Sequence, residues 1–409
     1  MAPPPSPRSR RSLDLLNFFI ADVQTGFGPF IAVYLTASKW TQVEIGFALT
    51  LGTLTAMLSQ VPAGAFVDAI RSKRLAAAGG ILAIMGSALL FALHPLTLSV
   101  YVAEILHGFA SCIISPAIAA ISLRLVGHAA LGERLGRNAR FASIGNGVAA
   151  AIMGAVGSYW SSSAVFWLTA ALGVPGLIAL YYIEPVTREV REVTRRRFSL
   201  SGLRHALTNR TLIVFWMAAL LFHVSNAALL PLAGTEATKA AGSAANLIIA
   251  ACIVVPQIMV ALISPWVGRV AEERGRRYAL VVGWAALPLR GLLMALSPTP
   301  FLLIAIQALG GISAATFGVM LPLIAADLTR DSGRFNLCMG VIGLAVFIGA
   351  SISTALAGWV ADVAGDGTAF VALSAAGLLG TALVWFGMPE TRPVTLCLRH
   401  ATLGRAAGR

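Results

Sequence analysis

Charged side chains are scarce in this sequence. Asp, Glu, Lys and Arg make up 11% of its 409 residues, whereas soluble domains carry about 25%. Hydrophobic residues make up 57%, and the mean hydropathy is +0.82. This composition excludes an ordinary soluble domain and predicts a chain that lies in a lipid bilayer.

Cysteine and catalytic motifs are also scarce. The four cysteines, Cys112, Cys252, Cys338 and Cys397, stand singly, without the Cys-x-x-Cys or Cys/His spacing of a zinc or redox site. We therefore predict no disulfide framework, no metal and no cofactor. The sequence also lacks a P-loop and a Gly-x-Ser-x-Gly motif, and we predict no catalytic residues.

Apolar runs of about 20 residues recur along the chain, the length that an α-helix needs to cross a bilayer. The sequence predicts an all-α integral membrane protein with twelve transmembrane helices. The first run is too long for a cleaved signal peptide and has no small-residue cleavage site, so we expect it to remain as a helix. The predicted spans are 13–36, 43–67, 75–93, 97–122, 139–160, 163–183, 211–232, 244–268, 278–296, 300–325, 336–360 and 368–388.

Positive charge is distributed unevenly over the predicted loops. Of the 30 Lys and Arg residues, 27 fall on one side of the membrane. Lys39 and Lys239 fall on the other side, and Arg290 lies inside a span. Because positive residues that flank spans mark the cytoplasmic face, both termini are predicted to be cytoplasmic. We expect a multi-pass protein of the cytoplasmic (inner) membrane, and the net charge of +13 requires no nucleic-acid partner.

An arginine-rich break divides the chain near its middle. The predicted domain organisation comprises a disordered basic cytoplasmic tail, a six-helix bundle, a basic cytoplasmic linker, a second six-helix bundle and a cytoplasmic tail. In the same order these segments are 1–12, 13–183, 184–210, 211–388 and 389–409.

The two halves share a weak repeat. Gly64 is followed by Asp68 and a basic cluster, and 204 residues later Gly268 is followed by Glu272 and another basic cluster. A second similarity joins the segment that begins at Gly136 to the one that begins at Gly333, at an offset of 197. Parallel repeats of about six spans are typical of transporters, whose substrate site forms where the halves meet.

These loops and the span count resemble the major facilitator superfamily, whose loop signature is Gly-x-x-x-Asp-Arg-x-Gly-Arg-Arg. The second copy follows it apart from its acid, whereas the first lacks the glycine and the arginine after the acid. The resemblance implies two pseudo-symmetric six-helix bundles and a cytoplasmic gate, in which Asp68 pairs with Arg124 or Arg140 when that side closes; the alternative is that these charges only set the topology. The implied gate residues are Gly64, Asp68, Arg71, Lys73, Arg74, Gly268, Glu272, Arg276 and Arg277.

Ionisable residues near the bilayer centre are costly unless they face water or a partner, so they are candidates for function. The resemblance implies that spans 1, 4, 7 and 10 surround a central cavity, and these spans carry such residues. The candidate cavity residues are Asp22, Gln24, Glu104, His107, His223, Asn226 and Gln307. Asp22 and Glu104 are candidates for the coupling proton; alternatively they bind a cationic group or pair structurally. Arg290 is expected on a peripheral helix, either snorkelling or paired structurally, or in contact with an anionic substrate.

The sequence thus predicts a secondary active transporter that moves a small solute by alternating access, with proton coupling by symport or antiport. The expected partners are a small-molecule substrate, protons and the bilayer, and the chain is expected to be a monomer. Glu104-Ile-Leu-His107-Gly108 stands where drug exporters carry Arg-x-x-Gln-Gly, so drug antiport is only one option. The alternatives are a transport-dead receptor or assembly factor and, least favoured, a membrane enzyme that uses Glu104 and His107 as metal ligands.

Overall fold

The computed structural model describes residues 6–25, 28–93, 96–184, 209–233, 245–296 and 299–392, and within these ranges it contains helices and no strands. The predicted linker, apart from its ends, and residues 393–409 lie outside the described residues. The helices of the N-terminal half are α1 (Pro7–Thr25), α2 (Gly28–Ala37), α3 (Gln42–Ala69), α4 (Lys73–Leu93), α5 (Thr97–Val126), η1 (His128–Ala130), α6 (Leu131–Tyr159) and α7 (Ser162–Tyr181). Those of the C-terminal half are α9 (Arg210–Asn226), α11 (Ala245–Glu273), α12 (Arg276–Ala295), α13 (Pro300–Leu328), α14 (Phe335–Ala364) and α15 (Asp366–Gly387).

Eleven helices within the described ranges are long and apolar enough to cross a membrane. The first predicted span, 13–36, is covered by α1 and α2, which lie on either side of residues 26 and 27. The prediction of an all-helical membrane protein is therefore confirmed.

Two helix starts differ from the prediction. The tail 1–12 was predicted to be disordered, but α1 begins at Pro7, because the Ser9 hydroxyl donates to Glu184 (3.3 Å) and anchors the first turn on the end of α7. Helix α6 begins at Leu131 instead of residue 139. Its first two turns carry Glu133, Arg134 and Arg137, so hydropathy missed them although they are helical.

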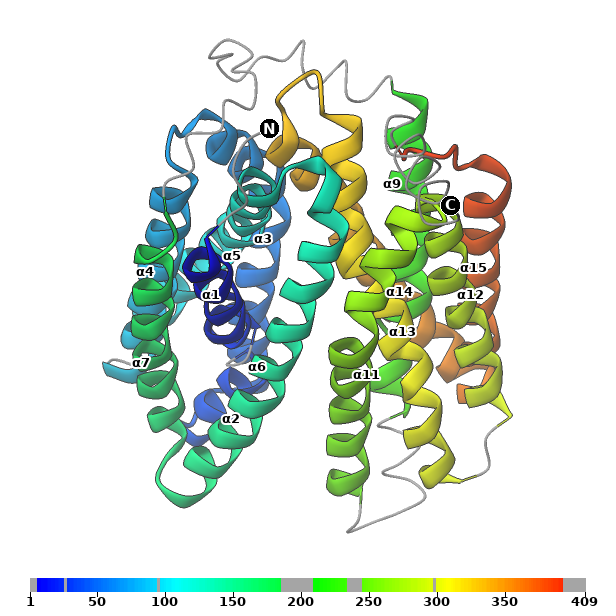
Figure 1. Ribbon diagram of the computed structural model, residues 1–409. Helices are drawn as coiled ribbons and strands as arrows, with labels where there is room; N and C mark the ends of the chain where they lie inside the picture. Colours follow the sequence, from blue (N-terminus) through cyan, green and yellow to red (C-terminus); the bar gives the residue numbers. More distant parts are fainter. Residues whose placement is uncertain are drawn as a thin grey trace, which may run out of the picture.

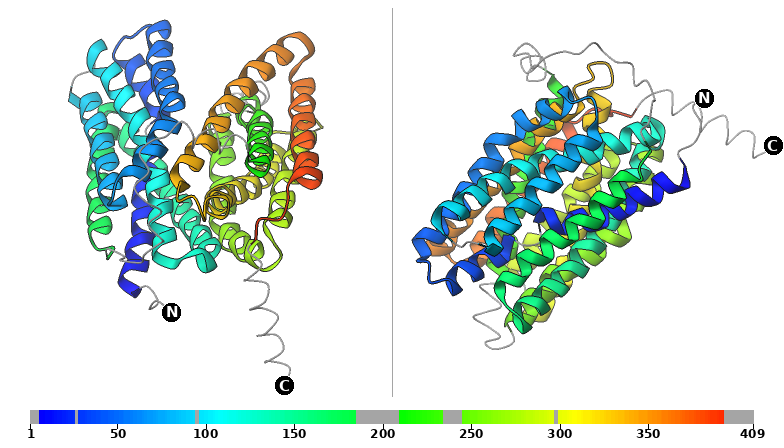
Figure 2. Two further views of the ribbon diagram at one scale, coloured as in Figure 1. Left: turned by 90° about the horizontal axis from the view of Figure 1, so that it is seen from above. Right: turned by 90° about the vertical axis from the view of Figure 1, so that its left-hand side faces the viewer.

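The two halves lie side by side, each as a bundle of helices (Figures 1 and 2). Corresponding helices begin at a nearly constant spacing: α14 starts 204 residues after α6, and α13 starts 203 residues after α5. The predicted offset of 204 between the halves is thus confirmed. The second similarity, at an offset of 197, is wrong as a structural equivalence, because the helix starts pair Gly136 with Gly340 rather than with Gly333.

The halves touch at one end of the bundle. We call it the basic end, because it carries the turns around Arg71, Arg134 and Arg276. There a Cβ atom added to Gly136 on α6 would collide with the Ser264 carbonyl of α11. Further along α6, Gly147 and Gly154 have no such neighbour within 4 Å. Helices α6 and α11 accordingly diverge toward the other end (Figure 1).

Candidate functional site

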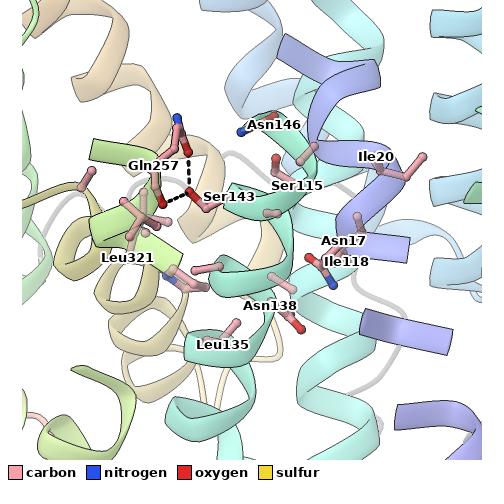
Figure 3. A pocket seen from close by; sticks show the side chains of 18 of the residues that line it. Asn17, Ile20, Ser115, Ile118, Leu135, Asn138, Ser143, Asn146, Gln257 and Leu321 are labelled. Atoms are coloured by element: carbon pink, nitrogen blue, oxygen red, sulfur yellow. Dashed lines mark hydrogen bonds between the residues drawn. The ribbon is translucent and has the colours of Figure 1, made fainter. Parts of the chain in front are cut away.

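A central cavity of about 460 Å³ lies between the halves, close to the basic end. It is lined by α1, α5 and α6 from one half and by α11, α13 and α14 from the other (Figure 3). Its polar lining residues are Asn17, Ser115, Asn138, Ser143, Asn146 and Gln257. Among the described residues that line it, none carries a formal charge, so the cavity offers amide and hydroxyl groups on an apolar wall.

A hydrogen bond between the halves crosses the cavity wall. The Ser143 hydroxyl of α6 donates to the backbone carbonyl of Gln257 on α11 (2.9 Å) and also lies against the Gln257 side-chain oxygen (Figure 3). On the same helix, Asn138 donates to the Ser122 hydroxyl (2.8 Å), which fixes its amide at the cavity floor. The polar groups on the otherwise apolar wall are therefore neutral, and these hydrogen bonds fix Asn138, Ser143 and Gln257 in place.

A buried ion pair supports this wall from the basic end. Arg134 donates to Asp14 on α1 (2.5 Å), and each side chain is 4% exposed. The Arg134 Nε also donates to the Asn138 Oδ1 (2.8 Å), so the pair continues directly into a cavity-lining residue. Arg137 adds a second contact to Asp14 (2.7 Å). The sequence reasoning missed this cluster, although an acid early in the first span and two arginines before the fifth were its visible signal.

Asp68 caps the N-terminus of a helix in the opposite half. Its carboxylate accepts hydrogen bonds from the Asn336 N–H (3.1 Å), the Asn336 amide (2.6 Å) and the Leu337 N–H (2.8 Å) at the start of α14. A carboxylate at this position satisfies free backbone donors and the positive end of the helix dipole. The expected pairing with Arg124 or Arg140 is not observed: these side chains donate to the carbonyls of Arg71 and Ala261.

Glu272 makes the equivalent contact in the reverse direction. Its Oε1 accepts from the Gly132 N–H (2.7 Å) and the Glu133 N–H (3.3 Å), at the start of α6. Gly64 and Gly268 allow the backbones to approach, since a Cβ at either would collide with a carbonyl of the opposite half, that of Asn336 or Gly132. The loop motif therefore forms two pseudo-symmetric contacts, which we call the latches.

The remaining motif residues hold their own half together. The Lys73 ammonium donates to the carbonyls of Val67 and Ile70 (2.5 and 2.9 Å), and Arg276 donates to Asp327 (3.0 Å). Other basic members bond backbone carbonyls: Arg74 that of Tyr181 and Arg277 that of Trp385.

Of the two acidic candidates for proton coupling, Glu104 lies away from the central cavity, and the side chain of Asp22 is not among the described residues. Asp22 and Gln24 fall in α1, but their side chains lie outside the described residues. Glu104 is buried between α5 and α3, where its carboxylate occupies the space that a side chain at Gly52 would need. Its Oε1 has no hydrogen-bond partner among the described residues. His107 lies one turn further along α5.

Two of the other candidates, Asn226 and Gln307, contact Arg290. This arginine reaches from α12 between α9 and α13, where it donates to the side-chain oxygens of Asn226 (2.7 Å) and Gln307 (2.5 Å). It passes over Gly310, which leaves room for the guanidinium, and is 4% exposed. Of the two structural roles expected for Arg290, snorkelling is therefore wrong, whereas the side chain does pair with neighbours inside the bundle. His223 packs instead against the Phe317 ring (4.7 Å), with its Nδ1 beside the Ala219 carbonyl.

The family model of the Major Facilitator Superfamily matches residues 13–237 and 215–403. The chain belongs to this superfamily. Major facilitator proteins are membrane transporters and not enzymes, so the chain is a multi-pass transporter of a small molecule.

Two relatives in Mycobacterium tuberculosis, from strains CDC 1551 and H37Rv, are each 35% identical over 394 residues and aligned over 94% of both chains. Each is named an uncharacterised MFS-type transporter. Two solved structures of FucP resemble the fold, one of the E. coli fucose:proton symporter (TM-score 0.75, 14% identity) and one in the outward conformation (0.74, 15%). Each covers 92% of this chain and 98% of FucP.

Within this major facilitator fold, none of the five described candidates, Glu104, His107, His223, Asn226 and Gln307, lines the central cavity. Glu104 lies eleven residues before the lining residue Ser115 on α5, about 16 Å further from the basic end. The neutral amides of α6 and α11 were missed because the resemblance directed the prediction to spans 1, 4, 7 and 10, whereas these helices are the fifth and eighth spans. Among the described residues, no cluster of three metal-ligating side chains occurs.

Proposed function

We propose that the protein is a secondary active transporter that moves a small solute across the cytoplasmic membrane by alternating access and couples this movement to protons. The basic end and both termini face the cytoplasm, as the positive-inside rule requires. The described structure then corresponds to an outward-facing state. The observation that carries the proposal is the pair of latches, which closes the cavity at one end while α6 and α11 diverge at the other.

The latches are suited to a reversible closure. Each consists of one carboxylate, Asp68 or Glu272, that bonds backbone N–H groups at the start of a helix in the other half. When the halves rock apart, both partners become hydrated, and neither half has to rearrange internally. The bond between Ser143 and Gln257 would break in the same movement. Transporters that are built from inverted or parallel repeats move their substrate by rigid-body rocking of the repeats about a central site.

Glu104 is the candidate carrier of the coupling proton whose side chain lies among the described residues. It is a carboxylate at a helix interface inside the membrane, one of whose oxygens has no hydrogen-bond partner in the described part of the chain, and such groups mark proton pathways. Asp22 remains the second candidate on the sequence. FucP is by its name a proton symporter, which supports proton coupling in a transporter of the same fold.

The test begins with a thermal-shift screen of metabolites and drugs, since a ligand stabilises the state that it binds. Each stabilising compound is then assayed in proteoliposomes for counterflow and for uptake driven by a pH gradient. Glu104→Gln and Asp22→Asn are expected to abolish pH-driven uptake while leaving folded protein, whereas Glu273→Gln, an exposed acid, serves as the control.

Two results would overturn parts of the proposal. If both acid variants took up substrate with the parent's pH dependence, these residues would not couple protons. If no stabilising compound showed counterflow, a receptor on the same scaffold would be favoured over a transporter.

A further inference from the structure

A second cavity, of about 190 Å³, lies at the basic end of the N-terminal half. It is formed by the turn between α3 and α4, the end of α5 and the end of α7. Four cationic side chains and one carboxylate line it. The lining residues are Arg71, Ser72, Lys73, Arg74, Ile121, Arg124, Ile183 and Glu184.

The corresponding place in the C-terminal half is neutralised by an acid. There Arg276 bonds Asp327 (3.0 Å), and both side chains are buried. At the repeat spacing of 203 residues, Arg276 corresponds to Lys73, but Asp327 corresponds to Arg124. The N-terminal half thus has the cation Arg124 where the C-terminal half has the carboxylate Asp327. At this position it has no negative charge to pair with Lys73.

A second carboxylate of the C-terminal half has no equivalent among the described residues of the N-terminal half. Glu390 accepts from the backbone N–H groups of Arg276 (2.9 Å) and Arg277 (3.2 Å) and so caps the start of α12. Within the described ranges, no acceptor bonds the corresponding N–H groups of Lys73 and Arg74 at the start of α4. The N-terminus of α4, which is the positive end of its helix dipole, therefore borders this cavity without a carboxylate cap from the described residues.

The carboxylate that does line the cavity is already engaged. The Oε2 of Glu184 accepts from the hydroxyl of Ser6 (2.8 Å), just before α1, and from that of Ser9 (3.3 Å) on its first turn. Lys73, Arg74 and Arg124 bond neutral carbonyl oxygens, and none of the four cationic side chains of the cavity forms an ion pair with another described residue. The described lining therefore carries four cations and one carboxylate, an excess of about three positive charges that an anionic ligand would balance.

The cavity lies where the apolar side of the bundle meets the basic end. Tyr181 beside it is 75% exposed and Leu75 is 71% exposed, and Ile178 is also exposed. Tyrosines at the end of a transmembrane helix typically lie at the headgroup level of a bilayer. A ligand that enters from this side is therefore a lipid headgroup.

We propose that this cavity binds the phosphate of an anionic phospholipid headgroup, held by Arg71, Arg74 and Arg124 and by the N-terminus of α4. The phosphate takes the place that the carboxylates of Asp327 and Glu390 occupy in the other half. A zwitterionic lipid is disfavoured, because its ammonium group would meet the same positive charges.

The test is native mass spectrometry of the purified full chain with added phosphatidylglycerol or phosphatidylcholine. The parent is expected to retain phosphatidylglycerol in preference. Arg71→Gln and Arg124→Gln should each lower this retention about fivefold, the effect of one basic residue near an anionic membrane surface. Arg269→Gln removes an exposed charge at the basic end outside the cavity and should change retention little.

Arg124→Asp makes the test sharper, because it gives the N-terminal half the charge arrangement of the C-terminal half. This variant should remain as heat-stable as the parent, through a new ion pair with Lys73, and should lose the preference for phosphatidylglycerol. A parallel melting series compares vesicles of phosphatidylglycerol with inorganic phosphate, and only the vesicles are expected to stabilise the parent.

The proposal would be overturned by equal retention of phosphatidylglycerol in the parent, Arg124→Gln and Arg124→Asp. Stabilisation by inorganic phosphate equal to that by the vesicles would overturn the assignment to a lipid. Should Arg71→Gln fail to fold, Arg124→Asp decides alone, since its expected stability and its expected loss of lipid are measured independently.

Discussion

Replacing Asp68 by asparagine should release the basic end. The substitution keeps the size of the side chain but removes its negative charge and turns one acceptor oxygen into a donor. Two backbone N–H groups at the start of α14 and the Asn336 amide then lose a charged acceptor. In the open state the Asp68 side chain is hydrated in both proteins, so the loss falls on the closed state alone.

The size of the effect follows from the helix N-terminus. A carboxylate in a partly buried position there contributes up to about 2 kcal/mol. At 1.4 kcal/mol per factor of ten, this changes the ratio of open to closed basic ends about 30-fold. If the closed state is about 99% populated in the parent, the open state rises from about 1% to about a quarter of the molecules.

Double electron-electron resonance can measure this shift. Spin labels at Leu75 and Arg269, which are exposed on different halves at the basic end, report the separation of the halves. The native cysteines Cys112, Cys252 and Cys338 are buried, and Cys397 is replaced by serine. Asp68→Asn should add a longer-distance population of about a quarter.

The matched control is Asp331→Asn, an exposed acid of the same end that forms no ion pair with a described residue of α14. If Asp68→Asn gave the same distance distribution as this control, the latch would not hold the halves together. A matching shift for Glu272→Gln, and a larger one for the double variant, is expected if the two latches contribute independently.

Two further predictions concern packing. Gly268→Ala places a methyl group against a carbonyl of α6, so it should populate the same open state and lower the melting temperature. Gly147→Ala has free space around the added methyl group and should do neither. Equal distance distributions for these two variants would refute the close approach of α6 and α11 at Gly268. Asp14→Asn leaves Arg134 buried without its anion and should destabilise the protein by about 3 to 5 kcal/mol, measured by thermal or chemical unfolding. An effect as small as that of removing the half-exposed Arg137 charge would show that the pair is not buried in solution.

The sequence alone was sufficient for the helices and for the repeat. Membrane spans require about 20 apolar residues in a row, so hydropathy located all but the charged first turns of α1 and α6 and the break within the first span. The loop motif revealed the offset of 204, because a glycine, an acid and basic residues at fixed spacing are recognisable without any partner.

The partners of those residues depended on the tertiary structure. Asp68 bonds the start of α14 rather than an arginine, and 268 residues separate it from Asn336. Arg290, expected at the periphery, lies buried between α9 and α13 because Gly310 leaves space for it. Neither relation leaves a local signal in the sequence.

For the central cavity, too, the sequence predicts the location, whereas the lining residues depend on the tertiary structure. The sequence placed a substrate site between two halves, and the structure has a cavity there, but Asn138, Ser143 and Gln257 line it in place of the ionisable candidates. Transmembrane helices are apolar on nearly every face, so periodicity does not tell which face meets the other half. Span number and orientation are properties of one segment and its charges, whereas the cavity wall depends on the rotation of each helix about its axis, which only the packing of distant helices fixes.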